Sequence, residues 1–226
     1  LGDVYKRQMK ENSREYQKAV DYICSEIANG NISIGDRLPT ERTLSGQLGI
    51  SRNSTREALR SLENMGITES VRGSGNYYTG NVSKKFSEMI RTLLMIKVVS
   101  KKDICDFRRT MELSVCMTIM NKSDFDFTEI ESVLNKETTS TDDEVDKDKM
   151  FHYLLAMSSG NVFWMAIMDA VIDVYRGWID EVIKIIGIDT KEKLDTAHKN
   201  ILSSLISKDK EKCENAINPV SYTHLR

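Results

Sequence analysis

Most of the chain consists of segments in which apolar residues recur every three or four positions, the spacing of helices that bury one face. In the first third of the chain this spacing predicts helices over about 16–28, 40–48 and 51–66. Thr40 and Ser51 stand where the second and third helices need N-caps, because their hydroxyls can accept a free backbone N–H. Two short helices joined by a tight turn are therefore expected after a longer one.

Strand-like signals follow directly after these helices. Residues 67–71 and 76–78 read as short strands, and the glycine-containing segment 72–75 between them permits a tight turn. Together they predict a β-hairpin. Helix, helix, turn, helix and hairpin is the outline of a winged helix-turn-helix, which we expect over residues 9–80.

From about residue 83 the pattern is helical throughout. The predicted helices lie near 84–97, 101–121, 124–138, 143–158, 161–186, 190–207 and 209–217. No strand-like alternation interrupts them. The fold class expected is therefore mainly α: an N-terminal winged helix-turn-helix plus a C-terminal all-helical bundle over residues 81–218.

The two ends of the chain fit no periodic pattern. Residues 1–8 precede the first methionine, and residues 219–226 follow the last predicted helix. We expect both to be non-native sequence, with the native C-terminus truncated after about residue 218.

Composition narrows the class of protein. Of the 226 residues, 40% are hydrophobic and 29% charged, which excludes a disordered chain. No apolar run approaches the roughly 18 residues of a membrane-spanning helix, so no membrane association is expected. The four cysteines are scattered and no secretory signal is present, which favours a reduced, cytoplasmic protein. The net charge of -2 does not indicate nucleic-acid binding, so only a local patch can.

Such a patch lies on the predicted helix 51–66. Its apolar stripe consists of Thr55, Ala58, Leu59, Leu62 and Met65. Burial of this stripe leaves Arg52, Asn53 and Arg56 largely outside. Arginine and asparagine hydrogen-bond base edges in a major groove that is wide enough for one helix.

Other residues of this region suit the DNA backbone. Arg42 and Ser51, at the starts of two helices, can meet phosphate oxygens, and Arg72 at the hairpin tip suits a backbone or minor-groove contact. Between residues 37 and 72 there are six arginines and no lysine. A solvated charged face is the ordinary alternative for one amphipathic helix. The turn spacing, the arginines and the hairpin together favour DNA binding.

Four polar residues of the C-terminal region occupy positions where helical periodicity expects a core. Asp148 and His152 are four residues apart and face the same way, His198 lies in a second apolar stripe, and Arg108 lies in a third. Buried together, they are costly unless they bind one another, a metal or an anionic ligand. Each alone has a plain structural interpretation, such as a core histidine or an ion pair of Arg108 with Glu112.

The N-terminal part of the chain resembles the GntR family of bacterial transcription regulators. The residues that carry the resemblance are Gly35-Asp36-Arg37-Leu38-Pro39-Thr40-Glu41-Arg42, Leu48 to Leu59, Leu62 to Ile67 and Arg72-Gly73-Ser74-Gly75. The resemblance implies operator-DNA contacts at Arg42, Ser51, Arg52, Asn53, Ser54, Arg56, Arg72 and Gly73.

The C-terminal half resembles the FCD effector domain of the FadR-like subfamily. The matching residues are Phe107 to Glu112, Asp148 to His152, Ser159-Gly160-Asn161 and Ala197 to Ile201. The resemblance implies metal ligands at Asp148, His152 and His198. A third histidine expected in metal-binding members falls at Val220, inside the predicted non-native tail.

The expected function is therefore that of a transcriptional regulator, not of an enzyme. We expect a C2 homodimer that binds double-stranded operator DNA. The helical domain is expected to hold a divalent metal ion (zinc, nickel or manganese), with a small organic acid effector bridging the ion and Arg108. Two alternatives stay open: the same regulator with a metal-free effector pocket, and a metal-dependent enzyme.

Overall fold

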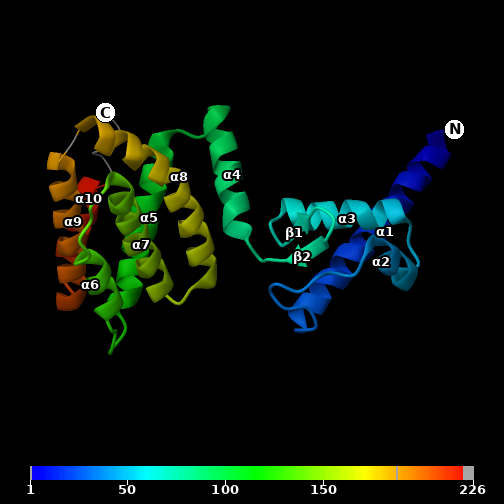
Figure 1. Cartoon of the computed structure of the whole chain (residues 1–226), viewed down its shortest axis with the longest axis horizontal. Helices are drawn as coiled ribbons and strands as arrows, with labels where there is room; N and C mark the ends of the chain where they lie inside the picture. Colours follow the sequence, from blue (N-terminus) through cyan, green and yellow to red (C-terminus); the bar gives the residue numbers. More distant parts are fainter. Residues whose placement is uncertain (1, 187, 221–226) are drawn as a thin grey trace. The chain divides into compact units, whose positions relative to one another are not determined.

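A computed structural model describes the backbone of residues 2–186 and 188–220, and the side chains of residues 13–140, 142–176, 178 and 194–217. Its contacts divide the chain into two compact units, residues 1–85 and 86–226, which we call the N-terminal and C-terminal units. The sequence pattern placed the link between the two parts at residues 80–83. Figure 1 shows the helices and strands of each unit.

The N-terminal unit consists of three helices and a two-stranded antiparallel sheet. The elements are α1 (Gly2–Ala28), α2 (Glu41–Leu48), α3 (Arg52–Asn64), β1 (Thr68–Val71) and β2 (Gly75–Tyr78). In the sheet Thr68 pairs with Tyr78 and Val71 with Gly75. This is the predicted winged helix-turn-helix.

Helices α2 and α3 both begin at the predicted N-caps. The Thr40 and Ser51 hydroxyls accept the backbone N–H groups of Thr43 and Ser54, which satisfies N–H groups that have no partner within either helix. Gly49 ends α2 in the left-handed conformation, at φ 62°. The sequence therefore determines where α3, the helix predicted to read DNA, begins.

The hairpin is held to the preceding loop by backbone hydrogen bonds. Gly35 N–H donates to Tyr78 O and Leu38 N–H to Asn76 O. At Gly75, with φ 128°, a Cβ would stand 2.8 Å from Arg37 Nε, so no larger residue fits without moving that side chain.

The apolar core of the N-terminal unit joins α1, α2 and α3. Its fully buried members include Ile23, Leu44 and Leu62. Met65, predicted to belong to the buried stripe of α3, is instead 48% exposed. It caps the C-terminal end of α3, one residue before the turn at Gly66, and so lies beyond the turns that pack on α1.

The C-terminal unit is helical throughout its described residues. Its elements are α4 (Val82–Met95), which begins just before the boundary, α5 (Lys101–Met120), α6 (Thr128–Leu134), α7 (Thr141–Ser158), α8 (Val162–Ile186), α9 (Ile188–Ser207) and α10 (Lys210–Val220). Each was predicted within a few residues except α6, which is shorter at both ends. None of the described helices is both long and apolar enough to span a membrane.

The main core of this unit lies among α5, α6, α7, α9 and α10. Phe151, Ile119 and Leu205 are among its large fully buried side chains. Helix α7 also packs along α8, and α10 packs against α9 and α5 (Figure 1). This packing brings residues far apart in sequence to the centre of the bundle.

The terminal segments differ from expectation where they are described. Helix α1 begins at Gly2 and α10 ends at Val220, so helical backbone includes residues 2–8 and 219–220, which showed no periodic pattern. Residues 221–226 lie outside the described residues. The non-native origin of both ends stays a prediction.

The difference in burial between Leu62 and Met65 predicts a difference in how much each side chain stabilises the fold. Leu62→Ala should lower the free energy of unfolding of the N-terminal unit by about 2–5 kcal/mol, because it removes a fully buried side chain and leaves a cavity. Met65→Ala should change it by less than about 0.5 kcal/mol, because the side chain is half exposed. Urea unfolding followed by circular dichroism measures both, and equal losses would contradict the packing described here.

Candidate metal centre and DNA-binding surface

Asp148, His152 and His198 meet inside the C-terminal unit. Asp148 and His152 lie one turn apart on α7, whose periodicity places both on one face, and His198 comes from α9. All three side chains are more than nine-tenths buried. The Phe151 ring packs between the helices, with its centroid 4.4 Å from that of His198. The fold thus brings together the three predicted metal ligands.

The distances within this cluster suit a shared ion. His198 Nε2 lies 3.3 Å and His152 Nε2 3.5 Å from the same oxygen, Asp148 Oδ1. One ligand atom from each residue lies within 4.8 Å of the others. Two ligand atoms held about 2.0–2.2 Å from one ion are separated by about 3–3.6 Å. The three residues could therefore hold a metal ion.

The hydrogen bonding of the cluster also favours a bound metal ion. Among the described residues, three buried atoms of the cluster have no aligned hydrogen-bond partner: His152 Nδ1, which lies near Glu112, and the pair Asp148 Oδ1 and His198 Nε2. An unsatisfied buried polar atom costs about 1–3 kcal/mol. An ion bound between Asp148 Oδ1 and His198 Nε2 would remove that cost for both, so the donor set fits a divalent metal.

Glu112 and Arg108, both on α5, surround His152 from the other side. Glu112 Oε1 lies 2.7 Å from His152 Nδ1 and accepts a hydrogen bond from Arg108 Nε at 2.8 Å. A carboxylate beside one ring nitrogen orients a histidine and leaves the other nitrogen for a metal. Glu112 is therefore part of the site. The sequence offered it only as an ion-pair partner of Arg108, which it also is.

The two carboxylates of this cluster, Asp148 and Glu112, stay ionised although they are buried. Burial raises the pKa of Asp148, but His152 and His198 outweigh burial and hold that pKa well below its usual range. Burial likewise raises the pKa of Glu112, and Arg108 and His152 bring it down to about 2. Burial lowers the pKa of His198, which keeps the imidazole neutral. Burial and Arg108 lower the pKa of His152, but Glu112 and Asp148 outweigh them and raise it, so a metal ion bound here would replace a proton on His152.

Arg108 is enclosed on every side that the structure describes. It is 2% exposed, pairs with Glu112, contacts His152 Nε2 through Nη2, and lies 4.0 Å above the centroid of the Tyr175 ring. The structure thus gives Arg108 the carboxylate partner that was its plain structural alternative. Its role toward an effector stays a prediction.

The third histidine expected from the family pattern has no counterpart among the described side chains. Its position, Val220, is the last residue of α10, and the side chain there is not described. His224 lies outside the described residues.

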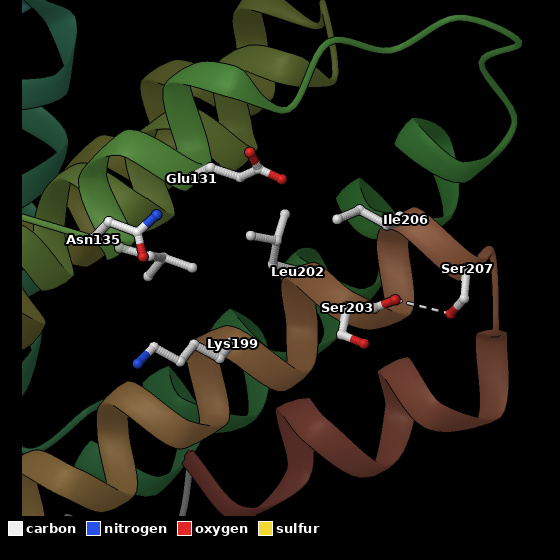
Figure 2. Close-up of a pocket in the computed structure, with 8 residues that line it drawn as sticks. Glu131, Asn135, Lys199, Leu202, Ser203, Ile206 and Ser207 are labelled. Atoms are coloured by element: carbon white, nitrogen blue, oxygen red, sulfur yellow. Dashed lines mark hydrogen bonds between the residues drawn. The ribbon is translucent and has the colours of Figure 1, made fainter.

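A separate groove of 600 Å³ lies between α6 and α9 (Figure 2). It is lined by Glu131, Leu134, Asn135, Lys199, Leu202, Ser203, Ile206 and Ser207. Leu134 and Leu202 are buried, whereas the polar lining residues are exposed. None of the predicted metal ligands lines it, so the groove and the metal cluster are distinct features of the same unit.

The predicted DNA contacts cluster on the N-terminal unit. Arg42, Ser51, Arg52, Asn53, Arg56, Arg72 and Gly73 are all exposed. They come from α2, from α3 with its cap, and from the turn between β1 and β2. The Arg56 guanidinium is paired within the unit, because its Nε and Nη2 donate hydrogen bonds to the Glu41 carboxylate at the start of α2.

Ser54 departs from this pattern. Its residue is 2% exposed, and its hydroxyl lies 2.8 Å from Ser51 Oγ and donates to Glu15 Oε2 at 2.8 Å. The Ser54 side chain is thus used within the domain rather than presented to DNA. Its expected contact with DNA came from the family resemblance, which does not reveal that Glu15 of a different helix meets Ser54.

Comparison with known proteins agrees with the two-domain fold. Residues 15–77 match the family model "Bacterial regulatory proteins, gntR family", and residues 103–219 match the FCD domain. Similar curated proteins include the regulator LutR of Bacillus subtilis, 26% identical over 84% of this chain and 90% of its own length. The Uxu operon regulator of Haemophilus influenzae is 29% identical over 66% of this chain.

The match to the Uxu operon regulator spans only 56% of that protein's length. Among solved structures, a GntR protein of Streptococcus agalactiae has the same fold, with a TM-score of 0.67, 21% identity and coverage of 92% of this chain and 97% of that one. The matches to both domains together cover most of the chain. The chain therefore belongs to the GntR family of bacterial regulatory proteins, in the branch whose C-terminal domain is an FCD domain.

Proposed function

We propose that this protein is a DNA-binding transcriptional regulator whose FCD domain binds a divalent metal ion and a small organic acid that changes operator affinity. The observation that carries the proposal is the buried Asp148, His152 and His198 cluster, in one chain with a winged helix-turn-helix that exposes its arginines. Similar proteins are named as regulators. A regulator of this kind acts on chromosomal DNA in the cytoplasm.

Three residues would hold the metal. Asp148 supplies a carboxylate oxygen, and His152 and His198 supply ring nitrogens, a donor set that suits zinc, nickel or manganese. Glu112 would hold the His152 ring in place through Nδ1. When bound, the ion supplies open positions at which a carboxylate ligand can bind.

Arg108 supports an anionic effector. In the structure, Arg108 Nη2 contacts His152 Nε2. His152 cannot give this one lone pair to both Arg108 and a metal ion. Arg108 then needs a new acceptor, and the carboxylate of an organic acid fits its fork in a charge-assisted contact.

The effector would act by shifting an equilibrium between two arrangements of the regulator. GntR regulators commonly act as dimers, and we propose that this chain forms a C2 homodimer that matches the two-fold symmetry of an operator. In each protomer α3 would enter the major groove, with the turn between β1 and β2 on the flanking backbone. An effector changes operator affinity only if it binds the two arrangements unequally.

The metal site is tested by elemental analysis of purified variants. Asp148→Asn and His198→Ala should each lose stoichiometric metal, because each removes a ligand, and both should keep the metal-free protein's DNA affinity. Glu112→Gln should weaken metal binding by about 10- to 100-fold, because it acts through His152. Asp169→Asn, which removes a partly exposed carboxylate of α8, is the control and should keep the metal. Full metal content in both ligand variants would reject the site, and a metal-free wild type would favour the metal-free pocket.

The DNA-binding surface is tested by replacing one exposed arginine of α3. Arg52→Ala should weaken binding to the DNA that flanks the protein's own gene by about 1–3 kcal/mol, because it removes a predicted base or phosphate contact. Arg91→Ala removes the same charge from the C-terminal unit, where Arg91 pairs with Asp173, and should bind as the wild type does. Fluorescence anisotropy measures both. Equal affinities of the two variants would contradict the assigned surface.

A further inference from the structure

A carboxylate from α1 occupies the start of the predicted DNA-reading helix. Glu15 Oε2 accepts the backbone N–H of Ser51 at 3.1 Å and the hydroxyl of Ser54 at 2.8 Å. Ser51 is the N-cap of α3, and its own hydroxyl accepts the Ser54 N–H. The hydrogen bonds from Ser51 and Ser54 lower the pKa of Glu15, which keeps its carboxyl group ionised.

The contact belongs to a longer attachment of α1 to α3. Beside Glu15, the Tyr16 hydroxyl donates to Ser61 Oγ at 2.6 Å, and Lys18 Nζ donates to the carbonyl of Leu48, the last residue of α2. Glu15 differs from these neighbours because it brings a full negative charge. That charge lies beside the N-cap, where the N–H groups and the dipole of a helix attract anions.

On a DNA-binding helix, the anion at this position would be a phosphate. Helix N-termini donate N–H groups to phosphate oxygens in protein–DNA complexes. In this chain the Ser51 N–H is already taken by Glu15, and a phosphate that approaches it meets a like charge. The neighbouring exposed Arg52 must then carry more of the attraction to DNA.

We propose that Glu15 is a positioning residue that also sets DNA affinity: it fixes the start of α3 through Ser51 and Ser54, and its charge weakens phosphate binding at that helix end. The inference rests on the proposed function. The Glu15 charge would make DNA binding depend less on backbone phosphates, which every duplex offers, and more on the arginine and asparagine contacts of α3.

The two roles of Glu15 are separated by two substitutions in the full chain. Glu15→Gln keeps an oxygen that can accept both hydrogen bonds but removes the charge. Glu15→Ala removes both the acceptor and the charge. Asp21→Asn is the matched control, because Asp21 is an exposed carboxylate of the same helix that accepts a hydrogen bond from Gln17, within α1.

Binding is measured by fluorescence anisotropy on an arbitrary duplex of about 30 base pairs and on the DNA that flanks the gene. Glu15→Gln should bind both about three- to tenfold more tightly than the wild type at low salt. The gain should shrink as salt rises from about 50 to about 300 mM, because screening weakens the removed repulsion. Asp21→Asn should match the wild type in DNA affinity.

The positioning role is measured by thermal unfolding. Glu15→Ala should have a lower unfolding temperature than Glu15→Gln, because α3 loses its hydrogen-bonded attachment to α1.

The outcomes distinguish this inference from the proposed function. A Glu15→Gln protein that binds no more tightly than Asp21→Asn, or whose gain persists at high salt, overturns the inference and leaves the proposed function standing. A wild type that shows no salt-sensitive binding to either duplex contradicts the proposed function itself.

Discussion

Five polar side chains are buried at the centre of the C-terminal unit. The three helices that carry them are packed so that these side chains partly balance one another's charges and hydrogen bonds. Glu112 lies between Arg108 and His152, and Asp148 lies between the two histidines. A charge buried without a partner costs several kcal/mol. A shift of α5, α7 or α9 would separate these partners and would therefore destabilise the unit by that amount. The compensation is incomplete, because Asp148 Oδ1 and His198 Nε2 keep unused hydrogen-bonding capacity.

This incomplete compensation is what makes the cluster a candidate binding site rather than only a structural network. A closed network would have paired every buried polar atom, as most protein interiors do. Here Asp148 Oδ1 and His198 Nε2 converge from two helices without an aligned partner. A cation with room for a further ligand matches this geometry and the donor set.

In the N-terminal unit, too, polar side chains from one helix pair with polar groups of another, here at the surface. The cap at Ser51 would form in any helix with this sequence, but Glu15 from α1 adds a second acceptor and a charge. The ion pair between Glu41 and Arg56 likewise links α2 to α3. Contacts between helices therefore decide which of the exposed polar groups on α3 remain available to a DNA ligand.

The sequence by itself determined the order of the elements and the ends of α2 and α3. Helical periodicity, the caps Thr40 and Ser51 and the glycine turn of the hairpin act over a few residues, so a single chain segment contains all the information they need. The spacing of Asp148 and His152 is local in the same way, because four residues make one turn of a helix.

Only the tertiary structure decided which partners these residues meet. His198 joins Asp148 because α9 packs beside α7, and Glu112 reaches His152 because α5 faces both. Ser54 was expected at the DNA but is buried against Glu15, some forty residues earlier in the chain. Such contacts depend on how helices pack, and periodicity gives the face that a side chain occupies without giving the neighbour that it meets there.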